Sequence, residues 1–301
     1  MGLWRGFEAV KFTKMEGCGN DYVYVDAREL EADWPALSRA MSDRHFGVGG
    51  DGLILIMDSD TADLRMRMFN ADGSEGEMCG NGIRCFAKYA LERGLASAGE
   101  DGLRVETAAG VRTVAPIMEN GRVMGARVAM GAPRLRPEEI PVSVDLYKGR
   151  WVGEAVVDYP LTVDGEELRL SFVSMGNPHA VAFLEAPVEE FPLHVIGPQV
   201  ETHPMFPRKV NFEIVNVLGD GGMRARVWER GSGETQACGT GACAIGVAAK
   251  LLDIMHRPLD ITENTVDIML PGGTLKVSWD GEGEVFMEGP AVEVFSGVWS
   301  E

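Results

Sequence analysis

The chain has 301 residues, of which 45% are hydrophobic and 25% are charged. This composition is typical of a soluble globular protein, and the length suits two domains of ordinary size. The 28 Lys and Arg residues are outnumbered by 46 Asp and Glu residues, which gives a formal net charge of −18. Such a surface repels phosphate backbones and anionic membranes, so we expect no nucleic acid and no membrane as partner.

The five cysteines show no paired framework typical of a secreted disulfide-rich protein. The first residues lack a continuous apolar segment of the kind found in signal peptides. No apolar run reaches the length needed to span a bilayer. These observations predict a cytoplasmic protein.

The first predicted unit, residues 10–26, is a strand, a glycine-rich loop and a second strand. Gly17-Cys18-Gly19 allows the backbone to turn tightly, and Asn20 follows at the tip of the loop. Judged alone, Asn20 fits a turn residue as well as a ligand-binding residue. A short helix is predicted over residues 36–41.

The segment Gly47-Val-Gly49-Gly-Asp-Gly52 matches the G-x-G-x-x-G pattern of dinucleotide-binding proteins. That fingerprint requires a strand before the glycines and a helix after them. Here the apolar run at residues 53–57 predicts a strand after the glycines instead. The match therefore predicts no nucleotide site.

The stretch from Leu64 to Gly94 is the most informative part of the first half. Residues 64–69 alternate between apolar and arginine side chains, which predicts a half-buried strand. After a polar turn, apolar residues recur with helical spacing from Cys79, and Gly94 supplies the stop. Cys79 then lies at a helix N-terminus, where free N–H groups favour negative charge and lower the pKa of a thiol. The alternative for a single such cysteine is a small side chain in a buried turn.

Further strands are predicted at residues 103–107, 111–117 and 123–130, the first two as a hairpin. The pattern breaks at residues 131–141, which are rich in proline, so we place a domain boundary there. We predict a first half of residues 1–131 with 288–301, and a second half of residues 132–287. In the second half, residues 193–201 predict a helix, and strands are expected at 210–217, 266–270, 273–279 and 284–288.

The second half repeats the first. The segment from Met223 to Leu252 aligns with the segment that begins at Leu64, with no gap between strand and cysteine. Cys79-Gly80-x-Gly82 aligns with Cys238-Gly239-x-Gly241, and residues 174–183 resemble residues 17–25. The chain is thus predicted to be a duplicated strand–turn–cysteine–helix unit. The helix after Cys238 is apolar nearly all round, which predicts that it is buried.

Two thiols related by internal symmetry suggest proton transfer on the two sides of one carbon. The N–H groups of Gly80, Asn81, Gly239 and Thr240 suit a carboxylate. One thiolate could then remove the proton next to that carboxylate while the opposite thiol delivers another. The outcome is inversion of a stereocentre without a cofactor or a metal.

Two other classes fit the sequence poorly. A dithiol redox protein would carry C-x-x-C, whereas Cys85 and Cys243 point away from the cysteines at the helix starts. A metal-binding protein would group its ligands, whereas the five histidines are scattered. Cys18, Cys85 and Cys243 are expected to be small buried side chains.

In its motifs the chain resembles the diaminopimelate epimerase family. The motifs follow one another along nearly the whole chain: Gly17-Cys-Gly-Asn20-Asp, Phe69-Asn70-Ala-Asp-Gly-Ser74, Met78-Cys79-Gly-Asn-Gly82, Ser174-Met-Gly-Asn-Pro-His179, Val210-Asn211 and Glu229-Arg230-Gly-x-Gly-Glu-Thr-Gln-Ala-Cys238. The resemblance implies an α/β (α+β) fold of two pseudo-symmetric domains, each a curved mixed sheet wrapped round a central helix, with the active site in the cleft between them. It also implies an epimerase that interconverts LL- and meso-2,6-diaminopimelate without pyridoxal phosphate, for lysine and peptidoglycan synthesis, and a homodimer.

The same resemblance assigns residues to roles. Cys79 and Cys238 would be the base and the acid, with His179 and Glu229 supporting the thiols. The substrate-binding residues would be Asn20, Asn70, Gly80, Asn81, Asn177, Asn211, Glu229, Arg230, Gly239 and Thr240. Arg230 would hold the non-reacting carboxylate through a bidentate contact. Cys18 and Gly52 depart from residues common in the family, often Leu and sometimes Gln, so the wall of the pocket is expected to differ in detail.

The alternative is a proline or hydroxyproline racemase on the same fold, which also uses two cysteines. Those enzymes typically carry His after the first Cys-Gly, where this chain has Asn81. Isomerases of this fold that lack the cysteine pair are excluded by Cys79 and Cys238. The third alternative is that the protein is not an enzyme.

Overall fold

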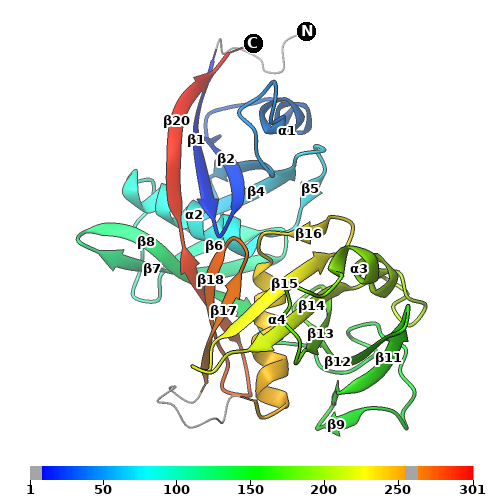
Figure 1. Ribbon diagram of the computed structural model, residues 1–301. Coiled ribbons are helices and arrows are strands. Elements are labelled where there is room, and N and C mark those ends of the chain that lie inside the picture. The colour runs from blue at the N-terminus through cyan, green and yellow to red at the C-terminus, as the bar shows by residue number, and fades with distance from the viewer. Residues whose placement is uncertain (1–8, 255–263, 301) are drawn as a thin grey trace. The chain divides into compact units, whose positions relative to one another are not determined.

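The computed structural model describes residues 9–254 and 264–300, and it is a mixed α+β protein (Figure 1). The chain separates into two compact units. Unit 1 comprises the chain up to Ala129 together with the residues from Glu288 onward, and unit 2 comprises Met130–Met287.

Unit 1 is a sheet with two helices. In order across the sheet its strands are β20, β1, β2, β3, β4, β6, β7 and β8; β2–β3 and β4–β6 are parallel and the other pairs are antiparallel. The elements are β1 (Val10–Gly17), β2 (Asn20–Asp26), α1 (Trp34–Ser42), β3 (Gly52–Met57), β4 (Leu64–Asn70), β5 (Glu75–Gly76), α2 (Gly80–Glu92), β6 (Leu103–Thr107), β7 (Gly110–Glu119), β8 (Arg122–Gly131) and β20 (Val292–Trp299).

Unit 2 repeats this topology. Its strands β11, β12, β13, β14, β15, β17 and β18 pair in that order, and β13–β14 and β15–β17 are the parallel pairs. The elements are β9 (Arg150–Val152), β10 (Ala155–Val157), β11 (Tyr159–Val163), β12 (Glu166–Ser174), β13 (Pro178–Phe183), α3 (Leu193–Glu201), β14 (Asn211–Val217), β15 (Met223–Glu229), β16 (Gly233–Thr235), α4 (Gly239–Leu251), β17 (Thr265–Leu270), β18 (Gly273–Ser278) and β19 (Val285–Pro290).

The internal repeat extends to individual side-chain ion pairs. In unit 1 the Arg67 guanidinium lies 2.7 Å from Glu75, across the pair β4–β5. In unit 2 the Arg226 guanidinium lies 2.7 Å from Glu234, across the pair β15–β16. Both ion pairs join the strand to the turn that leads to the cysteine, so the predicted internal repeat is confirmed.

The sheet of unit 1 is covered by one helix on each face. Leu53 and Leu55 of β3 belong to the hydrophobic cluster that includes Leu37 and Met41 of α1. Ile54 points to the opposite face of the sheet, toward α2. The Ile54 Cδ1 atom is so close to Gly82 of α2 that an ideal Cβ on this glycine would lie 2.7 Å from it. A strand with both faces covered is apolar at successive positions, which explains the uninterrupted run in β3.

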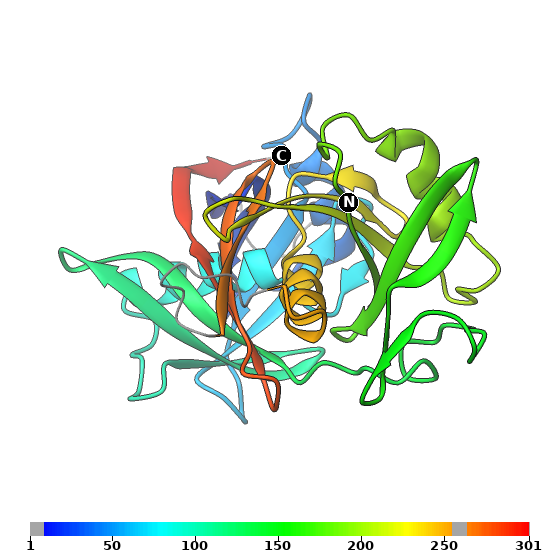
Figure 2. The ribbon, with the colours of Figure 1, turned by 60° about the horizontal axis from the view of Figure 1, so that its bottom comes forward.

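Helix α4 is the buried helix that its composition predicts. Ten of its residues are buried, and it packs against β12, β17 and β18 (Figure 2). An ideal Cβ on Gly246 would lie 2.7 Å from the side chain of Val277 in β18. Glycine at this position therefore allows the helix to approach the strand closely.

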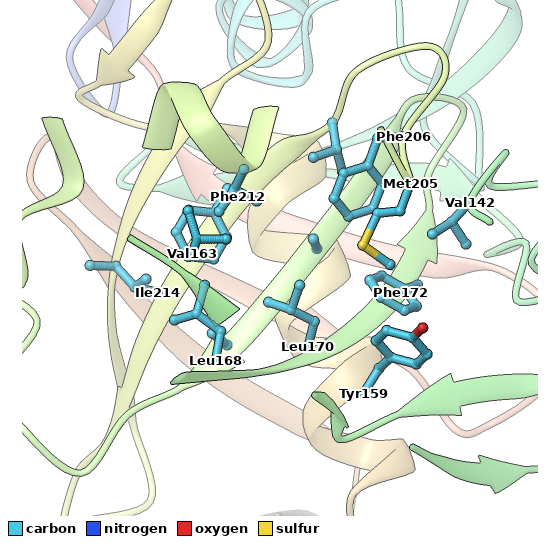
Figure 3. Close-up of a cluster of buried hydrophobic side chains, with 14 of the residues drawn as sticks. Val142, Tyr159, Val163, Leu168, Leu170, Phe172, Met205, Phe206, Phe212 and Ile214 are labelled. Carbon is cyan, nitrogen blue, oxygen red and sulfur yellow. The ribbon is translucent and has the colours of Figure 1, made fainter. Parts of the chain in front are cut away.

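The other face of the unit 2 sheet carries an aromatic core under α3 (Figure 3). Phe172 of β12 is fully buried, and its ring centroid lies 5.6 Å from that of Tyr159 and 5.8 Å from that of Phe206. Leu193, Ile196 and Val200 of α3 belong to the same cluster.

Most predicted elements are found within one or two residues of their expected positions, including both cysteine-bearing helices and the hairpin at residues 103–119. The glycines at 47–52 follow helix α1 and open strand β3. This order differs from the strand–loop–helix order of the dinucleotide fingerprint, as expected. Strands β9 to β12 carried no sequence prediction.

Candidate functional site

Cys79 and Cys238 occupy equivalent positions in the two units. Each is the N-cap residue of its helix, with an extended backbone and φ angles of −124° and −122°. The Cys79 sulfur accepts a hydrogen bond from Gly82 N (3.4 Å), and the Cys238 sulfur accepts one from Gly241 N (3.3 Å). The predicted placement of both thiols at helix N-termini is confirmed.

The side chains around the two sulfurs differ. The Tyr22 hydroxyl donates to Cys79 Sγ over 3.5 Å. Cys238 is 6% exposed and lies 3.4 Å from the Thr240 hydroxyl. Burial raises the pKa of the Cys238 thiol well above its usual value, and the nearby Glu229 and Glu213 carboxylates raise it further.

The Cys238 thiol experiences opposing influences. A helix N-terminus by itself lowers the pKa of a thiol, but at Cys238 the net shift of the pKa is upward. The Gly241 amide and the Thr240 hydroxyl do favour the thiolate, yet desolvation and two neighbouring carboxylates outweigh them. Burial and the two carboxylates therefore oppose the effect of the helix N-terminus on the Cys238 thiol.

Beside Cys79, the predicted ligands Asn20 and Asn81 are joined to each other. The Asn81 amide donates to Asn20 Oδ1, and Asn20 Nδ2 donates to Asp51 Oδ2 over 3.2 Å. Asp51 in turn receives the Arg44 guanidinium at 2.9 Å. Asp51 lies in the glycine-rich segment before β3, so this segment orients the Asn20 amide.

Beside Cys238, three predicted residues form a connected group. Asn177 Nδ2 donates to the Thr240 hydroxyl over 3.2 Å, and Asn177 Oδ1 lies 3.0 Å from His179 Nε2. His179 Nδ1 lies 2.7 Å from Glu213 Oε1, and both side chains are fully buried. Glu213 was missed by the sequence analysis. Its signal is a single acidic residue within the otherwise apolar or amide-bearing strand β14.

Asn211, Glu229 and Arg230 lie near one another in unit 2. Asn211 Oδ1 accepts from Arg230 N over 2.7 Å, and the buried Asn211 Nδ2 has no partner within the described residues. Glu229 accepts from the Thr235 hydroxyl at 2.5 Å, and burial raises the pKa of this carboxyl. The Arg230 guanidinium donates to Arg208 O (3.0 Å).

The remaining predicted ligands are backbone groups and one further amide. Gly80 and Gly239 open their helices, where N–H groups have no acceptor within the helix. Asn70, at the end of β4, donates from Nδ2 to Ser74 (2.9 Å), and no hydrogen bond found in the described ranges links its side chain to the Asn20–Asn81 pair.

The other cysteines are small buried residues, as expected. Cys18, Cys85 and Cys243 form no disulfide bond and are at most 1% exposed. Burial raises the pKa of Cys85 to about 12. Cys18 has a positive φ of 54° and lies 3.7 Å from the Arg84 guanidinium.

Gly52 opens strand β3 beside β4. An ideal Cβ at this position would lie 2.1 Å from the Phe69 carbonyl oxygen. A glutamine here would therefore require the backbone of β4 to move.

Within residues 9–254 and 264–300, no three His, Cys, Asp or Glu side chains are grouped so that they could hold a metal ion. Over the same ranges, no helix has the length and hydropathy needed to cross a membrane.

Comparison with known sequences gives a consistent result. The profile of the family described as "Diaminopimelate epimerase" matches residues 12–136 and 171–294, one match in each half. A protein from Moorella thermoacetica with that name is 50% identical over 289 residues, covering 95% of this chain and 98% of its own length. One from Desulfovibrio desulfuricans is 48% identical over 291 residues, covering 96% of this chain and 98% of its own length.

Solved structures that share the fold are more distant in sequence. A phenazine biosynthesis protein of the PhzF family from Bacillus anthracis superposes with a TM-score of 0.64 at 17% identity, covering 98% of this chain and all of its own. A hydroxyproline epimerase from Agrobacterium vitis gives a TM-score of 0.63 at 14% identity, covering all of this chain and 93% of its own. At these identities the likeness concerns the fold.

Proposed function

Because the chain belongs to the diaminopimelate epimerase family, a family of isomerases, we propose that it interconverts LL- and meso-2,6-diaminopimelate by a thiolate/thiol mechanism. The reaction requires no cofactor and supplies lysine and peptidoglycan precursors. The observation that carries the proposal is the pair of equivalent N-cap thiols, each hydrogen-bonded to the third residue of its own helix.

In the proposed reaction one cysteine acts as base and the other as acid. The thiolate removes the proton from the carbon next to a carboxylate, and the opposite thiol delivers a proton to the other side of that carbon. The N–H groups at the starts of α2 and α4 (Gly80, Asn81, Gly239 and Thr240) hold the carboxylate and stabilise the charge that it gains.

The environments of the two sulfurs differ. Cys79 accepts a hydrogen bond from the Tyr22 hydroxyl. Cys238 lies beside two carboxylates that raise the pKa of its thiol. The two sulfurs are therefore inequivalent, and each serves as base in one direction of the reaction and as acid in the other.

The other polar groups bind the two amino-acid ends of the substrate. Asn20 and Asn177 each donate one of their two side-chain amide hydrogens to a partner within the protein. The other amide hydrogen of each residue has no acceptor among the described residues. Asn211 presents its unpartnered Nδ2 group. With Asn70, Glu229 and Arg230 they offer both donors for carboxylates and acceptors for ammonium groups.

Arg230→Lys is expected to lower kcat/KM for diaminopimelate by about 10- to 100-fold. Lysine keeps the charge but loses the planar fork that holds a carboxylate through two hydrogen bonds. Losing one charge-assisted hydrogen bond costs ~1.5–3 kcal/mol, which corresponds to that range. Steady-state kinetics on the LL isomer provides the measurement. Arg224→Lys, in an exposed pair with Glu189, is the control, and near-wild-type kinetics of Arg230→Lys would exclude the contact.

Isotope exchange tests the reaction itself. In D2O, product formed at early times is expected to carry deuterium at the inverted carbon, while unreacted substrate carries almost none. The reason is that the delivered hydrogen comes from the opposite thiol, which exchanges with solvent. Mass spectrometry of both pools gives the measurement. A single base serving both sides would instead return some of its own proton to the product. Preferential turnover of proline or 4-hydroxyproline would refute diaminopimelate as the substrate.

We also propose that the protein is a cytoplasmic homodimer. Strand β20 offers apolar surface for such contact, because Val292, Val294, Phe295 and Val298 are all more than 40% exposed. Light scattering on the purified protein is expected to give twice the mass of one 32.6 kDa chain. A monomeric mass at micromolar concentration would contradict this.

A further inference from the structure

A continuous set of polar contacts connects Cys238 to the buried carboxylate of Glu213. Cys238 Sγ lies 3.4 Å from Thr240 Oγ1, and Asn177 Nδ2 lies 3.2 Å from the same oxygen. Asn177 Oδ1 is 3.0 Å from His179 Nε2, and His179 Nδ1 is 2.7 Å from Glu213 Oε1. All five residues lie in unit 2, on or beside β13, β14 and α4.

The orientation of the Asn177 amide fixes where the hydrogens lie. When Nδ2 donates to the Thr240 oxygen, the Thr240 hydrogen is free to point at the Cys238 sulfur, which then accepts as a thiolate. Asn177 Oδ1 must accept, so His179 Nε2 carries a hydrogen. The short contact between His179 Nδ1 and Glu213 then needs one further proton, and placing it on the ring gives an imidazolium paired with a carboxylate.

Rotation of the same amide by half a turn reverses every donor. Asn177 then donates to an unprotonated His179 Nε2 and accepts from the Thr240 hydroxyl. Thr240 accepts from the Cys238 thiol, and His179 Nδ1–H donates to Glu213. The two orientations therefore correspond to thiolate with imidazolium, and to thiol with neutral imidazole.

The charges in this region favour the coupling. Three acidic groups face one another here: Cys238, Glu213 and Glu229. A buried thiolate beside two carboxylates is costly unless a positive charge is added. His179, fully buried and in contact with Glu213, is the base positioned to supply it.

We propose that Cys238 and His179 change protonation state together, with the Asn177 amide as the switch and Glu213 as the positioning residue that keeps His179 ready to accept a proton. No proton passes through the amide, because each group exchanges with solvent or substrate. Loss of a proton at the sulfur favours gain of one at the ring, and the reverse holds by reciprocity. The proposal rests on the proposed role of Cys238 but not on the identity of the substrate.

Alkylation of Cys238 by iodoacetamide, followed by mass spectrometry as a function of pH without substrate, tests the coupling. In Glu213→Gln the midpoint is expected to rise by about one pH unit or more, because the glutamine no longer stabilises the imidazolium. If Glu213 acted on the sulfur only through its charge, its removal would lower the midpoint. A lowered or unchanged midpoint overturns the proposal. Glu92→Gln, which removes a carboxylate bonded to Lys88 and Val123 N in unit 1, is the control.

A second measurement tests the proposal even if the Glu213→Gln variant fails to fold. The 15N resonances of the His179 ring are expected to move toward the neutral form when Cys238 is replaced by alanine. Thr240→Val should abolish this dependence on Cys238, since it removes the hydroxyl link, and Thr240→Ser should retain it. His179 resonances that respond to Cys238 equally in the Val and Ser variants would overturn the proposal. Neither measurement uses substrate, so a failure of this proposal can be distinguished from a failure of the enzyme to epimerise diaminopimelate.

Discussion

Replacing either Cys79 or Cys238 by alanine is expected to lower the rate of epimerisation by more than about 100-fold, a loss of at least ~2.7 kcal/mol in transition-state stabilisation. Each sulfur serves one side of the reacting carbon, so each variant lacks either the base or the acid in both directions. The measurement is circular dichroism or chiral chromatography of LL- and meso-diaminopimelate over time.

The double variant and a matched cysteine complete this experiment. Cys79→Ala with Cys238→Ala is expected to be about as impaired as either single variant, since residues that act as a unit are not additive. Cys243→Ala removes a fully buried thiol five residues along the chain from Cys238, in α4, and should keep most of the activity. A single variant that retained more than about one hundredth of the wild-type rate would exclude the two-base mechanism.

Phe172→Ala is expected to lower the free energy of unfolding by about 3–5 kcal/mol, the usual range for deleting a fully buried aromatic ring. Phe172 packs between Tyr159 and Phe206 in the cluster under α3. Its removal leaves a cavity that the neighbouring strands cannot fill without moving. Urea unfolding followed by far-UV circular dichroism provides the measurement.

Tyr147→Ala in the same unit is the control for this substitution. The Tyr147 side chain is 99% exposed, so its loss should change the free energy of unfolding by less than ~0.5 kcal/mol. A cost below about 1 kcal/mol for Phe172→Ala would mean that the cluster is loosely packed.

The sequence by itself determined the repeated unit and the position of its thiols. Alternation in residues 64–70, helical spacing after Cys79 and the stop at Gly94 are local signals, and the backbone responds to each within a few residues. The same signals recur around Cys238, so the repeat could be aligned and the two helix N-termini predicted. Contacts fixed by short spacing, such as Gly241 N with Cys238 Sγ, follow from the helix itself.

Only the tertiary structure decided how each thiol is tuned. Glu213 comes from a different strand, and its carboxylate meets His179 because β13 and β14 lie parallel and adjacent. Burial by surrounding strands raises the pKa of the Cys238 thiol against the effect of the helix N-terminus. Asp51 orients Asn20 across 31 residues of sequence. Desolvation and side-chain orientation depend on residues far apart in the chain, so no local pattern could reveal them.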